Sequence, residues 1–330
     1  MTSPLPRSAN AWRLAHLSDP HLTVPDWRHW REMLNKRAPG YLAWRRRRRH
    51  VHRREILDAL VQDIGCQQPD HIALTGDLTQ LGLASECHQA RHWLEQLGDG
   101  ETVSVIPGNH DTYAPERGAS PLSLWGPWMQ DDPEPDTSSP SRSCLTQSRD
   151  NRAAFPWVRR RGGISLIGTS TALPTPWTMA TGGLGDAQLE RLAECLSRAG
   201  QRGDYRIVMI HHVPCPGMIR WRKRLTDMAA FRQVIRRCGV ELVLHGHAHR
   251  PLLGWLDTPT GRAPALGAPS ASLSHPEPAG YALLDIMPIT KGWSTTVTYR
   301  TLSGHSGHWH FTTRDSARLP DVNASTITAA

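Results

Sequence analysis

The chain has 330 residues, of which 38% are hydrophobic, so one large domain or two small ones can bury a core. Its formal net charge is +8, and eleven Lys and Arg against three Asp and Glu between Asp26 and Glu55 account for all of it. The other residues balance 27 against 27. Charge confined to one segment argues against a surface that binds nucleic acid generally.

The six cysteines are scattered and include no Cys-x-x-Cys pair, which excludes zinc-ribbon and thioredoxin-type sites. A chain of this length also has little need of a disulfide framework. The N-terminal residues contain no long apolar stretch, and no window approaches 18 apolar residues. We therefore expect no signal peptide and no membrane span, and a cytoplasmic protein.

Short apolar runs rich in β-branched residues alternate with segments of helical period, which predicts an α/β fold whose sheets are covered by helices. Helices are predicted around residues 55–65 and 186–196. A surface loop is expected at 130–143, and a polar, fraying tail at 301–330 follows a domain that spans residues 12–300. The predicted strands cover residues 13–18, 71–76, 102–108, 164–169, 206–212, 240–246, 281–286 and 293–300.

Polar residues of the kinds that bind metals follow five of the predicted strands. Because ligands collect at the carboxyl ends of strands in an open α/β sheet, these residues are expected to meet at one edge. Imidazole and carboxylate without thiolate fit Mn, Fe, Zn or Co rather than Cu(I) or an iron–sulfur cluster. The residues are Asp19 and His21, Asp77, Asn109 with His110 and Asp111, His211 and His212, and His247 and His249.

The number of these residues predicts two metal ions. Seven ligands exceed the need of one tetrahedral ion, but they suit two ions that share a bridging carboxylate and clamp the oxygens of a phosphoryl displacement. Each motif alone also has a structural explanation. Asp19-x-His21 or Asp77 could belong to simple turns, Asn109 could cap a turn, and either His247 or His249 could be a core residue. Their order at successive strand ends favours the metal site.

With the motifs D-x-H, GD, GNHD, H and GHAH in this order, the chain resembles the calcineurin-like metallophosphoesterases from about Trp12 to Arg300. The resemblance implies a four-layer αββα sandwich with two divalent ions, which can be Mn²⁺, Fe, Zn²⁺ or Co²⁺. It implies one of the adjacent residues His211 and His212 as a ligand, and His211 is preferred because only one side of a strand faces the site. Carried over by position, Asp19, His21, Asp77 and His249 hold the first ion, and Asp77 bridges to the second, which takes Asn109, His211 and His247.

The same resemblance places His110 beside the leaving group, as a general acid or a transition-state stabiliser, and Asp111 is expected to orient its ring. It implies that metal-activated water attacks phosphorus without a phosphoenzyme. The family hydrolyses phosphomonoesters, phosphodiesters and pyrophosphates, so the motifs leave the substrate open.

Residues of about 23–54 form an insertion between the first two motifs. Its first part would be amphipathic as a helix, with Trp27, Trp30, Met33 and Leu34 on one side, and the sequence APGY at 38–41 is expected to end that helix. Tryptophan and leucine beside arginine predict a contact with lipid phosphates or with a substrate diphosphate. An ordinary solvated helix face and a nucleic-acid contact are the alternatives. The residues concerned are Trp27, Trp30, Trp44, Arg45, Arg46, Arg47, Arg48 and Arg49.

A basic, apolar insertion near the site is similar to that of the UDP-2,3-diacylglucosamine pyrophosphohydrolases, which cut a nucleotide–lipid of lipid A synthesis at the inner membrane surface. This similarity implies peripheral association with an anionic membrane. The sequences GDLTQLGLASE and GNHD also look like those of bacterial cyclic-nucleotide phosphodiesterases, which act on soluble substrates. A scaffold that has lost its ligands is disfavoured because the ligand set is complete, and a nucleic-acid-binding protein because no aromatic platform is present.

Overall fold

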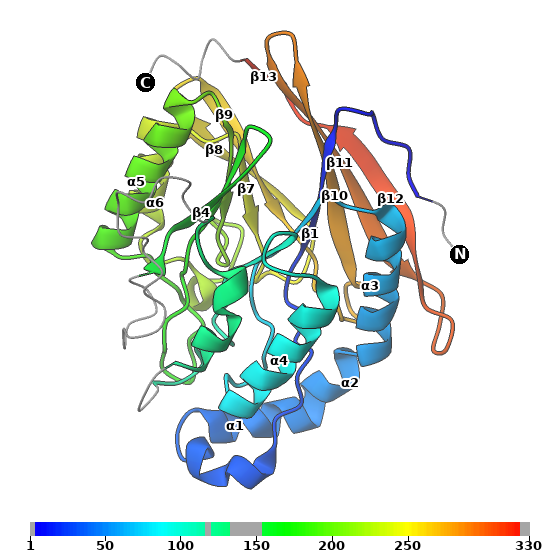
Figure 1. Ribbon diagram of the computed structural model, residues 1–330. Coiled ribbons are helices and arrows are strands. Elements are labelled where there is room, and N and C mark those ends of the chain that lie inside the picture. Colours follow the sequence, from blue (N-terminus) through cyan, green and yellow to red (C-terminus); the bar gives the residue numbers. More distant parts are fainter. Residues whose placement is uncertain (1–3, 116–119, 133–153, 324–330) are drawn as a thin grey trace.

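Two β-sheets packed face to face form the centre of the molecule (Figure 1). The computed structural model describes residues 4–115, 120–132 and 154–323. The first sheet has the order β12 (His310–Arg318), β11 (Gly292–Ser303), β10 (Gly280–Ile289), β1 (Trp12–Leu17), β2 (His71–Leu74) and β3 (Val103–Val105), and β13 (Val322–Asn323) pairs with β11. The second has the order β4 (Trp157–Arg161), β5 (Ile164–Gly168), β6 (Tyr205–Met209), β7 (Leu242–His245), β9 (Gly261–Gly267) and β8 (Leu252–Thr258).

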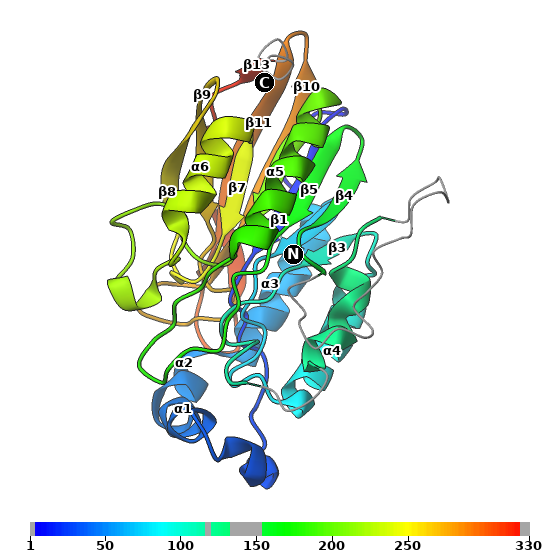
Figure 2. The same cartoon turned by 90° about the vertical axis from the view of Figure 1, so that its left-hand side faces the viewer.

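Helices cover the outer face of each sheet. Figure 2 shows α5 (Asp186–Gln201) and α6 (Met228–Cys238) in front of the second sheet. On the other side, α3 (Arg54–Gln67) and α4 (Ala84–Leu97) share a core cluster with the first sheet. The predicted αββα sandwich is therefore confirmed.

Side chains alternate in direction along the buried strands of the second sheet, and each face of the sheet packs against a different layer. In β6, Ile207 and Met209 point into the cluster between the two sheets, whereas Val208 points into the cluster beneath α5 and α6. Successive side chains of a strand face opposite sides, so a strand buried on both faces reads as a continuous apolar run. This is why the sequence shows these strands so clearly.

The strands β1, β2 and β3 run parallel in one sheet, and β5, β6, β7 and β9 run parallel in the other. Their carboxyl ends therefore meet at one end of the sandwich. The predicted strands all appear, but β6 ends at Met209 and β7 at His245, so the motif histidines lie in the loops just beyond the strands.

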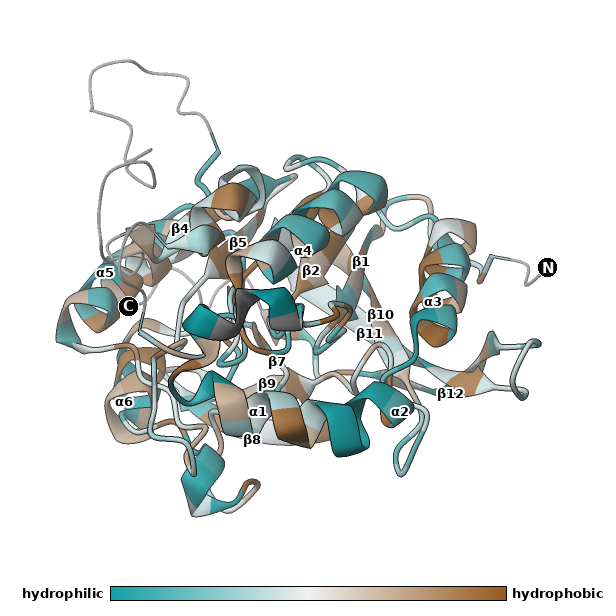
Figure 3. Ribbon diagram, turned by 90° about the horizontal axis from the view of Figure 1, so that it is seen from below, coloured by the Kyte–Doolittle hydropathy of each residue, from teal (hydrophilic) through white to brown (hydrophobic). Residues whose placement is uncertain are grey.

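The insertion lies across this same end of the sandwich (Figures 1 and 3). It folds as the 3₁₀ helix η1 (Trp27–Met33), α1 (Arg37–Ala43), the π-helical η2 (Trp44–Arg48) and the short α2 (Arg49–Val51). Figure 3 shows the arginine-rich part of this segment, from η2 to α2, coloured mostly as hydrophilic.

The expected helix break at APGY is wrong. These four residues lie inside α1, and the chain instead leaves helical geometry at Leu34. Pro39 is tolerated because it occupies the first turn of α1, where a backbone N–H has no intrahelical partner. A side chain at position 40 would collide with its surroundings, since a Cβ there would lie 2.6 Å from Tyr113 Oη.

Of the side chains expected on the apolar side of the first helix, Met33 is buried whereas Leu34 is 74% exposed, so these two differ in their surroundings. The side chains of Trp27 and Trp30 lie outside the described part of the structure.

The prediction of a fraying tail after residue 301 is wrong for most of that segment. Strand β12 pairs with β11 from Thr296↔Arg318 to Ser303↔His310, and only Phe311 of β12 is buried. The strand is polar because it lies at the sheet edge and is exposed on both faces beyond Phe311, which is why the sequence shows no apolar period there. The expected loop at 130–143 falls largely outside the described residues.

Candidate metal centre

The loops after β1 and β2 continue to pair beyond the ends of their strands. The amide of Asp19 donates to Gly76 O, and that of His21 donates to Asp77 O, both at 3.0 Å. Side chains join further loops to this pair, because His110 N donates to Asp77 Oδ1 at 2.7 Å and His247 N donates to Asp19 Oδ2 at 2.9 Å. Four strand ends are thus tied together through two carboxylates.

The backbone at the predicted ligands is unusual. In the described part of the chain, six residues other than glycine have positive φ, and five of them belong to the predicted metal site. Left-handed backbone is sterically unfavourable for L-residues, although Asp and His tolerate it better than most. Such conformations gather at functional sites, where they aim side chains that a regular strand would turn away. The five are Asp19, His21, Asp77, His247 and His249, with φ between 40° and 67°.

Two groups of potential ligand atoms meet at one shared carboxylate. Asp19, His21, Asp77 and His249 offer atoms within 4.8 Å of one another, and Asp77 forms a second such group with His211 and His247. All are buried except His249, whose side chain is 27% exposed. Asn109 joins the second group, since its Oδ1 lies 3.2 Å from His211 Nε2.

Backbone carbonyls select which nitrogen of three imidazoles faces these groups. A carbonyl oxygen can only accept a hydrogen bond, so the ring nitrogen facing it carries the proton and the opposite nitrogen is left for a ligand. The three donors are His21 Nδ1 to Thr79 O at 3.0 Å, His211 Nδ1 to Thr75 O at 2.6 Å, and His247 Nε2 to Lys223 O at 3.1 Å.

The remaining nitrogens converge on carboxylate and amide oxygens. His211 Nε2 lies 3.4 Å from Asp77 Oδ2, and His21 Nε2 lies 3.8 Å from the same oxygen. Lone pairs that face one another in a buried site repel unless a cation or a proton lies between them. The donor set and its tautomers therefore fit divalent cations.

The pKa values of His211 and Asp77 show that a proton can occupy the place between them that a metal ion would take. Burial opposes charge on His211, but the charge of Asp77 and a hydrogen bond to it raise the pKa of His211 to about 9. Burial likewise opposes ionisation of Asp77, yet His211 and His110 hold the pKa of that carboxyl well below its usual range. A metal at this site would displace the His211 proton, because metal ligands bind deprotonated.

The adjacent histidines 211 and 212 have different surroundings. His211 faces Asp77, as described, whereas His212 Nδ1 lies 2.7 Å from Thr171 Oγ1 and its Nε2 donates to Ala180 O at 3.2 Å. Both nitrogens of His212 are thus engaged away from the cluster.

His110 lies at the rim beside His21, with ring centroids 4.8 Å apart. The expectation that Asp111 orients this ring is wrong. His110 Nδ1 instead donates to Gln80 O at 2.6 Å, and the carboxylate of Asp111 accepts from the amides of Gly108, Asp77 and Thr79. Asp111 therefore holds the two loops that carry Asp77 and Asn109.

The structure adds His52, a residue of the insertion that sequence analysis did not single out, and it brings Arg48 of the arginine run to the site. His52 groups with His21 and His249, and Arg48 Nη1 lies 3.2 Å from His110 Nδ1. Because Nδ1 already donates to Gln80, the guanidinium acts there as a neighbouring positive charge. Burial and the charge of Arg48 lower the pKa of His110 to about 3. The only sequence signal for His52 was that two histidines, His50 and His52, follow the arginine run directly.

Buried contacts of Arg37 and Lys36 hold the insertion against the site. Arg37 Nε donates to Leu81 O at 2.9 Å and Lys36 Nζ to Thr175 Oγ1 at 2.8 Å. Arg48 is half-buried, whereas Arg45, Arg46, Arg47 and Arg49 are exposed and Trp44 is half-buried against Tyr41.

Two ligand groups that share a buried carboxylate at the carboxyl ends of parallel strands define a two-metal hydrolase. A family model described as calcineurin-like phosphoesterase matches residues 13–251, more than half of the chain. The chain belongs to this family and is a metal-dependent phosphoester hydrolase that uses two divalent ions. No curated protein sequence matches it.

Solved structures share the fold at low sequence identity. A dimetal phosphatase from Danio rerio is 12% identical, with a TM-score of 0.56, over 88% of this chain and 96% of that one. The purple acid phosphatase PPD1 from yellow lupin (Lupinus luteus) is 14% identical, with a TM-score of 0.59, over 99% of this chain and 57% of that one.

None of the helices in the described part of the chain is both long enough and apolar enough to cross a membrane.

Proposed function

We propose that Asp19, His21, Asp77 and His249 hold the first ion and that Asp77, Asn109, His211 and His247 hold the second. The two groups of atoms around Asp77 support this assignment. The ligands allow Mn²⁺, Fe, Zn²⁺ or Co²⁺, because imidazole and carboxylate serve all four.

When bound, the two ions would lower the pKa of a water molecule and neutralise negative charge on the phosphoryl oxygens. The chain contributes fixed geometry. Asp77 is held between the loops by His110 N, and Asp111 ties its backbone to Gly108. A nucleophilic side chain is not required, so we propose direct attack of water on phosphorus.

His110 is proposed to face the leaving group. Its Nδ1 is occupied by Gln80 O, so Nε2 is the atom available to a departing oxygen, and Arg48 adds positive charge beside the ring. Arg48 can stabilise negative charge that develops on the leaving oxygen. His110 can do so when Nε2 also carries a proton, a state that the negative charge of a bound phosphate favours.

For the substrate, we propose a phosphodiester or pyrophosphate that carries acyl chains, such as UDP-2,3-diacylglucosamine, cleaved at an anionic membrane surface. The supporting observation is the rim around the site. Leu34 is 74% exposed, Trp177 69% and Trp221 63%. Trp177 lies in the loop bound by Lys36, and Trp221 precedes Lys223, whose carbonyl binds His247.

Exposed Leu and Trp, together with the exposed Arg45, Arg46 and Arg47, are typical of a surface that enters the lipid interface while cations contact phosphates. Leu42, three residues before Arg45 in the chain, is also exposed, at 44%.

A soluble cyclic-nucleotide phosphodiesterase is the second candidate. The sequence GDLTQLGLASE supports it, and its Gln80 carbonyl is the group that fixes His110. This candidate leaves the exposed Trp177 and Trp221 without a role.

The test is release of nucleotide by metal-loaded protein from UDP-2,3-diacylglucosamine in mixed micelles, run beside 3′,5′-cyclic AMP. Release of UMP from the lipid, with cyclic AMP untouched, is the expected result. Turnover of cyclic AMP alone would overturn the lipid proposal and support the second candidate.

A further inference from the structure

His52 is fixed at the junction between the insertion and the body of the protein. It ends α2 with extended backbone, φ −87° and ψ 113°, and forms an antiparallel bridge with Leu273. Arg53 N donates to Ser272 O at 2.9 Å, and Ser274 N donates to Val51 O at 2.8 Å. Backbone hydrogen bonds on both sides of His52 therefore determine where its side chain points.

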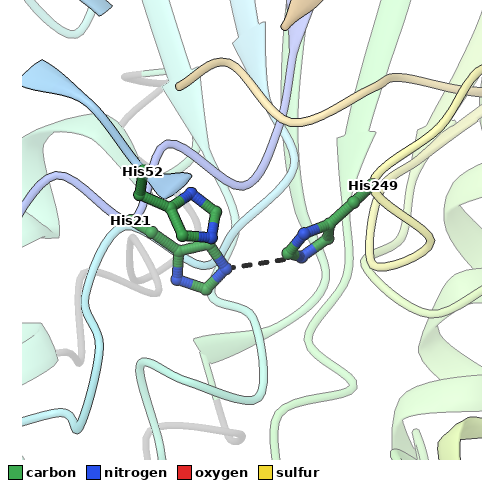
Figure 4. Close-up of side chains that lie close together, drawn as sticks. All are labelled: His21, His52 and His249. Atoms are coloured by element: carbon green, nitrogen blue, oxygen red, sulfur yellow. Dashed lines mark hydrogen bonds between the residues drawn. The ribbon is translucent and has the colours of Figure 1, made fainter. Parts of the chain in front are cut away.

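The ring of His52 lies beside two ligands of the proposed first ion. Its centroid is 4.6 Å from that of His21 and 5.8 Å from that of His249. Figure 4 shows the three imidazoles gathered together, with the dashed line joining His21 Nε2 and His249 Nε2 at 3.4 Å. One nitrogen from each of the three rings lies within 4.8 Å of the others.

Hydrogen bonding leaves one nitrogen of His52 for the cluster. Nδ1 lies 2.8 Å from Ser272 Oγ, so Nε2 is the remaining ligand atom. A hydrogen bond of this kind on the nitrogen that faces away from the ion fixes the orientation and tautomer of a metal-binding imidazole.

We propose that His52 is a further ligand of the first metal ion, supplied by the insertion and additional to the residues of the five family motifs. The inference rests on the proposed two-ion site. His52 groups with the imidazoles of His21 and His249, while the carboxylates of Asp19 and Asp77 group separately with the same two rings. It therefore approaches the ion from the side of the insertion.

A third imidazole changes the chemistry of the first site. With His21, His52 and His249 present, nitrogen ligands outnumber the two carboxylates, and imidazole favours Zn²⁺, Fe or Co²⁺ over Mn²⁺. The ligand also links metal binding to the position of the insertion, because His52 and Arg48 lie only four residues apart and both reach the site.

The experiment compares metal affinities of full-length His52→Ala and the wild-type protein. Each is freed of metal and titrated with Zn²⁺ in competition with a chromophoric chelator. We expect the wild type to bind two ions and His52→Ala to bind one of the two at least 10-fold more weakly, with the other unchanged. His50→Ala is the matched control, because His50 lies two residues earlier, in α2, and is exposed.

Loss of a half-buried ring could also loosen the segment, so His52→Gln is measured as well. Glutamine retains a polar group that can reach Ser272 but is not a ligand for Zn²⁺, and we expect the same weakening. A changed visible spectrum of the Co²⁺-substituted variants relative to wild type and His50→Ala provides a second readout of the coordination shell.

Unchanged affinity and an unchanged Co²⁺ spectrum in both His52 variants would overturn the proposal. That failure is distinct from failure of the two-ion site itself, which would appear as a wild-type protein that binds fewer than two ions.

Discussion

Arg48 Nη1 lies 3.2 Å from Nδ1 of His110, so one member of the arginine run reaches the candidate active site. Its neighbours Arg45, Arg46 and Arg47 are exposed. The run therefore has two parts with different surroundings: one guanidinium that can meet the substrate, and four, including that of Arg49, that are exposed.

This division predicts different effects for two similar substitutions. Arg48→Ser is expected to lower kcat/KM for a small soluble phosphodiester roughly 10- to 100-fold, because a charged hydrogen-bond donor beside the leaving group is lost. Arg46→Ser, which removes an exposed guanidinium two residues away, serves as the control and should leave kcat/KM unchanged. Equal rates for both variants would remove Arg48 from the site.

His110→Ala is expected to reduce turnover roughly 10²–10⁴-fold while the protein still binds two ions. The reason is that the His110 ring lies at the rim, beside His21, and that alanine keeps the backbone amide that donates to Asp77. Steady-state kinetics and metal analysis on the same sample test the expected loss of turnover and the expected retention of two ions. Near-normal turnover would contradict the role at the leaving group, and loss of metal would identify the ring as structural.

Asp77→Ala should lose both ions, because the carboxylate belongs to both groups of ligands. Metal content after dialysis against a weak chelator measures this. Asp58→Ala is the control, since Asp58 is an exposed carboxylate on α3. Two ions retained per Asp77→Ala chain would show that the carboxylate does not bridge.

Replacing Arg45, Arg46 and Arg47 together with Ser is expected to weaken binding to vesicles that contain anionic lipid, at roughly 1 kcal/mol per residue near the surface. Activity on a small soluble diester should be kept because Arg48 remains. The control removes three exposed arginines from α5 and α6, namely Arg198, Arg236 and Arg237. If both triple variants sediment with vesicles to the same extent, the arginine run has no specific role at a membrane.

His71, at the start of β2, predicts a loss of stability in acid. Burial and then the charges of Arg159 and Arg161 lower the pKa of His71 to about 3, from 6.5 in the unfolded chain. As the pH falls below 6.5, the unfolded chain binds a proton that the folded protein excludes. Stability therefore decreases between pH 6.5 and about 3, by about 2 kcal/mol at pH 5.

Urea unfolding of wild type and His71→Gln at pH 7.5 and 5, with chelator present, isolates this contribution. Glutamine can keep the hydrogen bond to Ser104 without titrating. The wild type should lose about 2 kcal/mol more than the variant between the two pH values, and parallel losses would show that His71 titrates normally.

The fold and the ligand positions could be predicted because their signals are local. A buried strand such as β6 is a continuous apolar run, and a ligand such as His211 follows it directly in the chain. The contacts of His52 and Arg48 could not be predicted, since they depend on how Arg37 and its neighbours dock the insertion on distant loops. Gln80 was missed as the partner of His110 because its backbone carbonyl, which any residue type supplies, makes the contact.

The left-handed backbone at Asp19, His21, Asp77, His247 and His249 also bears on how this protein can change. A conformation of this kind costs about 1–2 kcal/mol per residue, so the metal-free chain folds against a penalty concentrated in a few loops. Glycine at any of the five positions would relieve part of it and remove a ligand at the same time. Heat-resistant variants selected without regard to activity are therefore expected to accumulate substitutions at the metal centre, where gains in stability and loss of catalysis coincide.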